Sequence, residues 1–116
     1  VRPLKEQERL EGTILNFREE GIVSVHDKNG PRDFQFDHSF GPQNSQEDVF
    51  NEASPLLQTV ADGYNVSVFA YGPTGSGKTH TMMGDKGSKT KGLTYRVLDA
   101  LFRIGKERAV VVDQHV

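Results

Sequence analysis

The stretch that most constrains the fold is Val66–Thr79, which reads VSVFAYGPTGSGKT. Its first part is an apolar run typical of a buried strand, and a glycine-rich turn of the form GxxxxGK(S/T) and a helix start follow it. In this order the backbone N–H groups of the turn can surround phosphate oxygens, and the helix N-terminus adds partial positive charge. The pattern therefore predicts a strand, a phosphate-binding loop and a helix of an α/β protein.

Each residue type in this loop suits a triphosphate ligand. Its glycines permit backbone angles and a close phosphate approach that a Cβ atom would block. Lys78 can place an ammonium group between the terminal phosphates, and the Thr79 hydroxyl can bind a phosphate-bound magnesium ion. The alternative is a chance glycine-rich loop, which the strand directly before it disfavours. The predicted phosphate-contacting residues are Gly72, Pro73, Thr74, Gly75, Ser76, Gly77, Lys78 and Thr79.

Composition narrows the class of protein. The chain has 116 residues, enough for one domain, and its 14 basic and 16 acidic residues give a net charge of −2. A net charge this small gives no overall electrostatic attraction to nucleic acid or to a membrane surface. The absence of cysteine excludes disulfides and thiolate metal sites, and we expect no structural metal because the histidines are scattered at His26, His38, His80 and His115.

Neither a signal peptide nor a membrane span is expected, because no apolar run is long enough, and this favours an intracellular protein. The chain begins at Val1 without methionine and stops soon after the apolar run Ala109–Val112. We therefore interpret residues 1–116 as a fragment truncated at both ends.

The N-terminal part reads as a small antiparallel β lobe. Thr13–Leu15 and Ile22–Val25 are predicted strands joined by a charged turn at Arg18–Gly21, and Asp27–Gly30 is a predicted hairpin turn. In the next strand, residues 33–40, alternation predicts one buried aromatic face that includes a structural histidine. That face consists of Phe34, Phe36, His38 and Phe40.

Two helical segments flank the phosphate loop. Before it, Ser45 is a predicted N-cap, and apolar residues at helical spacing continue to Ala61, with Gly63 as the stop. Pro55 conflicts with one continuous helix, so we expect a bend or boundary near Ser54.

After the loop, a short helix should be interrupted at Gly84. Residues 85–92 are then an exposed loop whose lysines are either solvated or contact an acidic partner. A second helix should run from an N-cap at Thr94 to Gly105, and Ala109–Val112 should open another strand.

The run from Asp62 to Tyr71, continued by GPTGSGKTHTMMG, resembles the phosphate-loop region of kinesin motor domains. The residues around Tyr64 and at Met82–Gly84 resemble those of the C-terminal-motor, minus-end-directed subgroup of kinesins. The resemblance extends along most of the chain, through Val1–Leu4, Phe36–Phe40, Ser45–Phe50 and Gly92–Val97.

This resemblance implies a P-loop NTPase fold and a microtubule-stimulated ATPase that uses ATP and Mg²⁺. Lys78 would bind the β- and γ-phosphate oxygens and Thr79 the magnesium ion, while His80 and Pro3 match positions beside the adenine and sugar. It also implies a cytoplasmic, cytoskeletal protein with coiled coil, which binds microtubules through segments that this chain lacks. Two alternatives stay open: a truncated, non-catalytic product that acts at most as an interaction module, and an unrelated phosphate-loop kinase or GTPase.

Several features depart from the family pattern. The first arginine of its Arg-x-Arg-Pro motif would precede Val1, Pro73 replaces a common glutamine, and Tyr95 a common proline. Neither of the family's switch segments, Asn-x-x-Ser-Ser-Arg and Asp-x-x-Gly, is expected in this chain, so no catalytic residue is assigned and the chain alone should be inactive. The chain resembles the first third of a motor domain with an incomplete central sheet, in which Val66–Phe69 would lack ladder partners and stability would be marginal.

Overall fold

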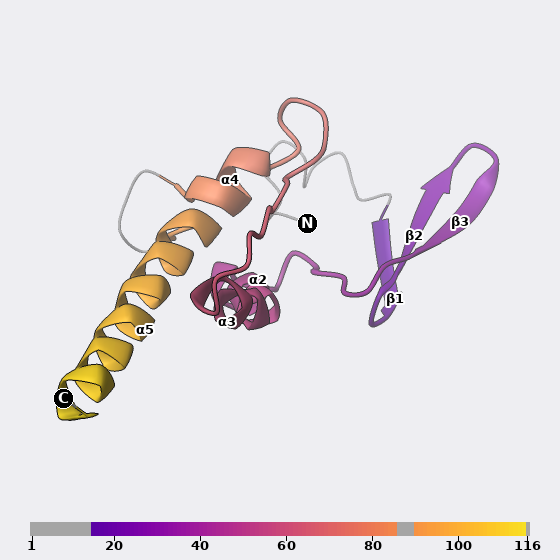
Figure 1. Cartoon of the computed structure of the whole chain (residues 1–116). Coiled ribbons are helices and arrows are strands. Elements are labelled where there is room, and N and C mark those ends of the chain that lie inside the picture. The colour runs from indigo at the N-terminus through magenta and orange to yellow at the C-terminus, as the bar shows by residue number, and fades with distance from the viewer. Residues whose placement is uncertain (1–14, 86–89, 116) are drawn as a thin grey trace. The chain divides into compact units, whose positions relative to one another are not determined.

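The computed structural model describes residues 15–85 and 90–115 (Figure 1). The interpretations of Val1–Leu4, including Pro3, and of Thr13 and Ile14 concern residues outside that range. The chain divides into two compact units, Val1–Asn44 and Ser45–Val116. Each unit is described by itself.

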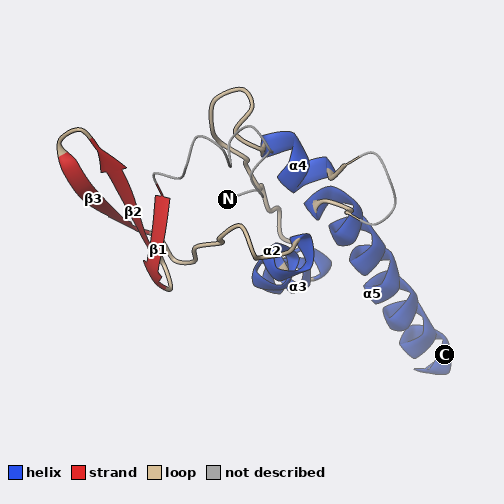
Figure 2. Ribbon diagram, turned by 180° about the vertical axis from the view of Figure 1, so that it is seen from behind, coloured by secondary structure: helices blue, strands red, loops and turns tan. Residues whose placement is uncertain are grey.

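In the first unit, residues 15–35 form a three-stranded antiparallel sheet (Figure 2). It contains β1 (Leu15–Glu19), β2 (Ile22–Asp27) and β3 (Gly30–Gln35) in the order β1-β2-β3. Asp27 pairs with Gly30 across the second turn, and Gly30 has a φ of 99°, which a β-carbon disfavours. The predicted antiparallel lobe and hairpin turn are confirmed, although the first turn is tighter than predicted because β1 continues to Glu19.

The predicted buried aromatic face is wrong for this unit. The third strand ends at Gln35, and the side chain of Phe36 is 55% exposed, although its backbone N–H still donates to the Gly21 carbonyl oxygen at 2.7 Å. Phe34 is also exposed. An aromatic sheet face is buried only when another layer covers it, and no helix lies in the described part of this unit.

The described residues of the second unit form four helices, which are drawn in blue in Figure 2: α2 (Gln46–Ala53), α3 (Pro55–Ala61), α4 (Lys78–Met83) and α5 (Leu93–His115). The predicted boundary near Ser54 is confirmed, because α2 ends there and Pro55 occupies the first turn of α3.

The predicted helix start at Ser45 is also confirmed. The Asp48 N–H donates to Ser45 Oγ at 3.1 Å, and the Ser45 N–H donates to Asp48 Oδ2 at 2.8 Å. This reciprocal capping box satisfies two backbone donors that the helix itself cannot pair. The start of α2 is therefore held in place by its own first turn.

The last helix differs from the prediction in three ways. It begins at Leu93 rather than after an N-cap at Thr94, it passes through Gly105, and it includes Ala109–Val112, where a strand was predicted. A helix pairs its backbone groups within one segment, whereas a strand needs a neighbour, and the described part of this unit contains no strand. One interior glycine costs only about 1 kcal/mol, which a long helix tolerates.

The segment before the phosphate loop is not a buried strand. Residues 64–71 form no strand pairing, and Phe69 and Tyr71 are 87% and 101% exposed. The prediction of a buried strand is therefore wrong for this chain. The outcome agrees with the expectation that Val66–Phe69 lacks ladder partners.

The described part of the second unit has a small apolar core, in which Leu57 of α3 and Leu93 of α5 are buried. An ion pair adds a polar contact between α3 and α5. Arg108 donates through Nη1 to the Ala61 carbonyl oxygen at 2.6 Å and through Nη2 to Asp62 Oδ1 at 2.8 Å. The hydrogen bond from Arg108 is the main reason that the pKa of Asp62 lies below its ordinary value.

We predict that the chain melts broadly and at low temperature, because little apolar area is removed from water and aromatic side chains stay exposed. Circular dichroism during heating and during urea titration measures this. A steep two-state transition that is the same by both methods would contradict the prediction.

We also predict that Arg108→Ala raises the pKa of Asp62 toward its ordinary value of 3.8. Because the folded-state pKa is the lower one, Asp62 stabilises the folded state above the unfolded-state pKa, and this contribution disappears as the pH falls through the folded-state pKa. Carboxyl ¹³C NMR titration measures the change. Arg103→Ala, elsewhere on α5, is the control and should leave the Asp62 titration unchanged.

Candidate nucleotide-binding loop

The phosphate-loop sequence forms a compact turn that leads directly into α4. The Ser76 N–H donates to the Pro73 carbonyl oxygen at 3.1 Å, and the Thr81 N–H donates to the Gly77 carbonyl oxygen at 3.0 Å. Gly77 caps the helix in the left-handed region, with a φ of 108°. The predicted order of glycine-rich turn and helix start is confirmed as local structure.

The two side chains that are predicted to contact phosphate and magnesium lie together at the start of one helix. Lys78 and Thr79 are the first two residues of α4, and both are exposed. An ammonium group and a hydroxyl group are therefore available to a ligand beside the exposed residues Thr74, Gly75 and Ser76.

His80 is the next residue of α4, and it is bonded through both its side chain and its backbone. Its ring Nδ1 lies 3.3 Å from Asp85 Oδ1, and its side chain is 24% exposed. Its carbonyl oxygen accepts a hydrogen bond from Gln46 Nε2 at 2.6 Å. Sequence reasoning missed Gln46, because 34 residues separate it from His80 and no local pattern indicates the contact.

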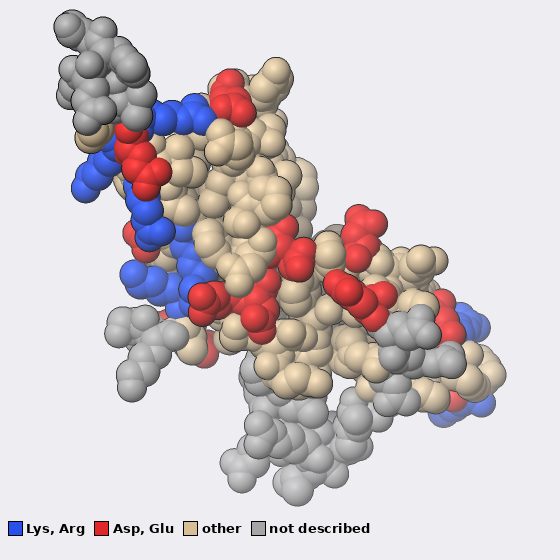
Figure 3. Space-filling model, turned by 90° about the horizontal axis from the view of Figure 1, so that it is seen from below, with Lys and Arg blue, Asp and Glu red and all other residues tan. Residues whose placement is uncertain are grey.

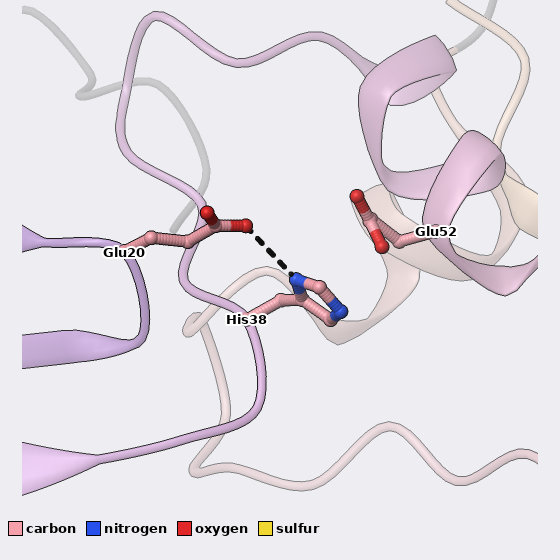
Figure 4. A group of neighbouring side chains, drawn as sticks. All are labelled: Glu20, His38 and Glu52. Carbon is pink, nitrogen blue, oxygen red and sulfur yellow. Dashed lines mark hydrogen bonds and ion pairs between the residues drawn. The ribbon is translucent and has the colours of Figure 1, made fainter.

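Two features of the first unit bear on the sequence predictions. His38 Nδ1 lies 3.2 Å from Glu20 Oε1 (Figure 4), so this histidine has a partner as predicted, although its side chain is 45% exposed. The spacing Asp-x-x-Gly does occur at Asp27–Gly30, but there it forms the turn between β2 and β3. It is part of a hairpin and not of a nucleotide site.

The charged and apolar surfaces of the described residues have a different character from this loop. Figure 3 shows Lys and Arg side chains interspersed with Asp and Glu on the face in view, as the near-neutral composition predicts. A groove of about 450 Å³ on α5 is almost entirely apolar and is lined by Leu98, Leu101, Phe102, Gly105 and Lys106. Among the described helices, none combines the length and hydropathy required to cross a bilayer.

Comparison with known proteins identifies the family. The model of the kinesin motor domain matches residues 1–114, nearly the whole chain. The chain belongs to the kinesin motor domain family. The resemblance seen in the sequence is thereby confirmed, and the alternative of an unrelated phosphate-loop enzyme is rejected.

The sequences of individual kinesins are also similar to this chain. Kinesin-like protein KIN-14Q of Oryza sativa subsp. japonica is 39% identical over 100% of the chain, and kinesin-like protein KIN-14P of Arabidopsis thaliana is 42% identical over 93%. The chain spans only 13% and 11% of these relatives.

A solved structure described as that of a fast kinesin superimposes with a TM-score of 0.79 at 33% identity. The match covers 88% of this chain and 30% of that kinesin. The predicted fold class, a fragment of a kinesin-like P-loop fold, is confirmed.

We predict that Gly77→Ala destabilises the start of α4 by about 1–2 kcal/mol, because alanine resists the left-handed backbone conformation found there. Amide hydrogen exchange in α4 and α5, which reports local opening without requiring a two-state transition, measures the effect. Gly105→Ala is the matched control, because an added β-carbon in this helix interior meets no atom within 4 Å and should stabilise α5. Equal effects of the two substitutions would contradict the assignment of Gly77.

Proposed function

We propose that this chain is the ATP-binding, N-terminal part of the motor domain of a microtubule-based motor ATPase. The observation that carries the proposal is the glycine-rich turn at residues 72–77, in which glycines with positive φ lead directly to Lys78 and Thr79 at the start of α4. Membership of the kinesin motor domain family supports ATP as the nucleotide.

Within this proposal, different residues of the chain hold the phosphates, the magnesium ion and the nucleoside of Mg-ATP. Backbone N–H groups within Gly72–Thr79, other than Pro73, which has none, and the Lys78 ammonium would bind phosphate oxygens. The Thr79 hydroxyl binds magnesium, which neutralises phosphate charge. His80 would lie beside the adenine and sugar, and Pro3 is assigned there from the family resemblance alone. Oxygen ligands suit a hard cation such as Mg²⁺, so these residues fit the group.

Motor activity belongs to the longer protein in this proposal. Phosphoryl transfer depends on positioning water and stabilising charge on the γ-phosphate, and no residue of this chain is assigned to either task. Microtubule binding and a cytoskeletal location in the cytoplasm are proposed for the parent. The KIN-14 names of the relatives support placing the parent in that group, and the predicted C-terminal-motor subgroup is retained with it.

A second candidate is a non-catalytic product that binds nucleotide weakly or not at all. The exposed side chains of Phe69 and Tyr71 favour it, because the segment that supports the phosphate loop has no strand partner in the described unit. A loop supported in this way is less well preorganised, and preorganisation raises affinity.

We predict that Lys78→Ala weakens Mg-ATP binding by at least about tenfold, which corresponds to about 1.4 kcal/mol, because it removes a charge from the phosphates. Isothermal titration calorimetry of the full chain measures the change. Lys106→Ala, which removes an exposed charge of α5, is the matched control and should leave binding unchanged.

Two results separate the candidate functions. Saturable binding that depends on Lys78 supports the ATP-binding proposal. Absence of binding, or binding that Lys78→Ala does not change, rejects the phosphate loop as a site in this chain and favours the non-catalytic alternative.

A further inference from the structure

We propose that the exposed apolar side of α5 binds the same surface of a second copy of this chain, with the two helices antiparallel. The proposal is independent of nucleotide binding, because it uses no residue of the phosphate loop or of α4. It starts from two exposed side chains of α5, since Leu98 is 47% and Phe102 is 71% exposed. Both line the apolar groove of about 450 Å³.

The α5 helix is apolar on two sides, and the described residues of its unit cover one of them. On the covered side Leu93 is buried and Val97 and Ile104 are half-buried, and α5 packs against α2, α3 and α4. A helix that is apolar on more than one side is normally buried on each of them. The second side of α5 is therefore expected to have a partner.

The exposed side has the residue spacing of a helix that packs against another helix. Its residues follow one another at alternating intervals of three and four positions, which keeps them on one line along the helix. We call them the α5 stripe, and they are Tyr95, Leu98, Phe102, Gly105 and Ala109, all of them exposed.

The shape of the stripe suits a copy of itself. Phe102 offers a large ring, whereas an added β-carbon at Gly105 would meet no atom within 4 Å. In a dimer with a two-fold axis, a residue that contacts a second position also receives that position from its partner. Phe102 of each copy can therefore lie over Gly105 of the other. Placing large residues opposite small ones in this way lets the two helices interlock.

The charges beside the stripe fit the same register. Asp99 and Lys106 flank it, lie seven residues apart and are both exposed. When Phe102 of one copy lies over Gly105 of the other, the two-fold axis brings Asp99 of each copy near Lys106 of the other. Two ion pairs result, one on each side of the axis. Complementary charge together with complementary shape identifies a second copy as the partner.

The charges also set the direction of the helices. In a parallel pair of the same stripe, Lys106 would lie beside the apolar Leu101 of the second copy and would gain no ion pair. Asp99 Oδ2 lies 3.6 Å from Lys91 Nζ of its own chain, but a carboxylate accepts from more than one donor. Because exposed ion pairs contribute little energy, they select the orientation while apolar burial supplies most of the affinity.

The association should be weak and reversible. From Tyr95 to Ala109 the stripe is about 21 Å long, because a helix rises about 1.5 Å per residue. One pair of helices over this length is a small contact compared with a standard stable interface of about 1,600 Å². We therefore expect a monomer–dimer equilibrium that depends on protein concentration.

Sedimentation velocity of the full chain at several concentrations measures the association, and circular dichroism of the same samples measures helix content. Phe102→Gln removes the ring, and Gly105→Leu fills the space that receives it. Asp99→Lys places like charges opposite each other, and the double variant Asp99→Lys with Lys106→Asp makes them opposite again. The matched control is Glu107→Gln, which removes an exposed charge of α5 outside the stripe.

The average mass of the unmodified chain should rise with concentration toward that of a dimer and no further. The dimer should weaken at least about tenfold in Phe102→Gln and Gly105→Leu, through lost burial and a steric clash respectively. Asp99→Lys should weaken it about three- to tenfold, and the double variant should restore it, which misfolding would not explain. Glu107→Gln should behave as the unmodified chain does.

Gly105→Leu separates the proposed register from unspecific apolar association. It adds apolar surface, so it would strengthen an unspecific contact, whereas it clashes with Phe102 of the second copy in the proposed one. Phe69→Ser tests the other exposed apolar segment, residues 64–71, and should leave the dimer unchanged.

Four results would overturn the inference: a chain that stays monomeric, growth beyond a dimer, stronger association in Gly105→Leu, or loss of the dimer in Phe69→Ser. A monomeric chain would leave the stripe to be covered by other parts of the longer protein. Since no nucleotide is present in these measurements, failure here leaves the proposed ATP-binding function unaffected.

Discussion

Every backbone N–H and C=O group removed from water needs a partner, and this requirement explains most of the local structure of the chain. Residues 15–35 meet it by pairing three neighbouring strands. Residues 93–115 meet it within one helix, which includes the apolar run Ala109–Val112. Residues 64–71 have no strand neighbour and remain largely exposed to solvent. Phe69 and Tyr71 are the most exposed of their large apolar side chains.

The phosphate loop depends less on such neighbours. Its turn is closed by bonds within a few residues, and Gly77 supplies the left-handed conformation at the start of α4. Short-range sequence therefore builds the loop even where the preceding strand is missing. The Gln46 contact adds a long-range attachment of α4 to α2. Tertiary contacts therefore fix the position of the loop and α4 more than they fix the shape of the loop.

Features set by local chemistry were predictable. The capping box at Ser45, the break at Pro55 and the hairpin turn ending at Gly30 each follow from the conformational preferences of single residues, and all three are confirmed. The recognition of a kinesin motor domain was also available from the sequence, since the motif around the phosphate loop extends well beyond the glycines. Its ligand contacts stay predictions.

Features set by distant partners were not predictable. The alternation of Phe34 and Phe36 indicated a buried face, but burial requires a second layer, and none lies within the described part of that unit. Gly105 looked like a helix end, yet the helix continues because no strand is available to its last residues. The turns, the caps, the loop and the family all follow from local residue preferences and motifs. Whether an apolar segment became a strand, a helix or exposed chain depended on tertiary contacts, because a strand or a buried face exists only when another segment pairs with it or covers it.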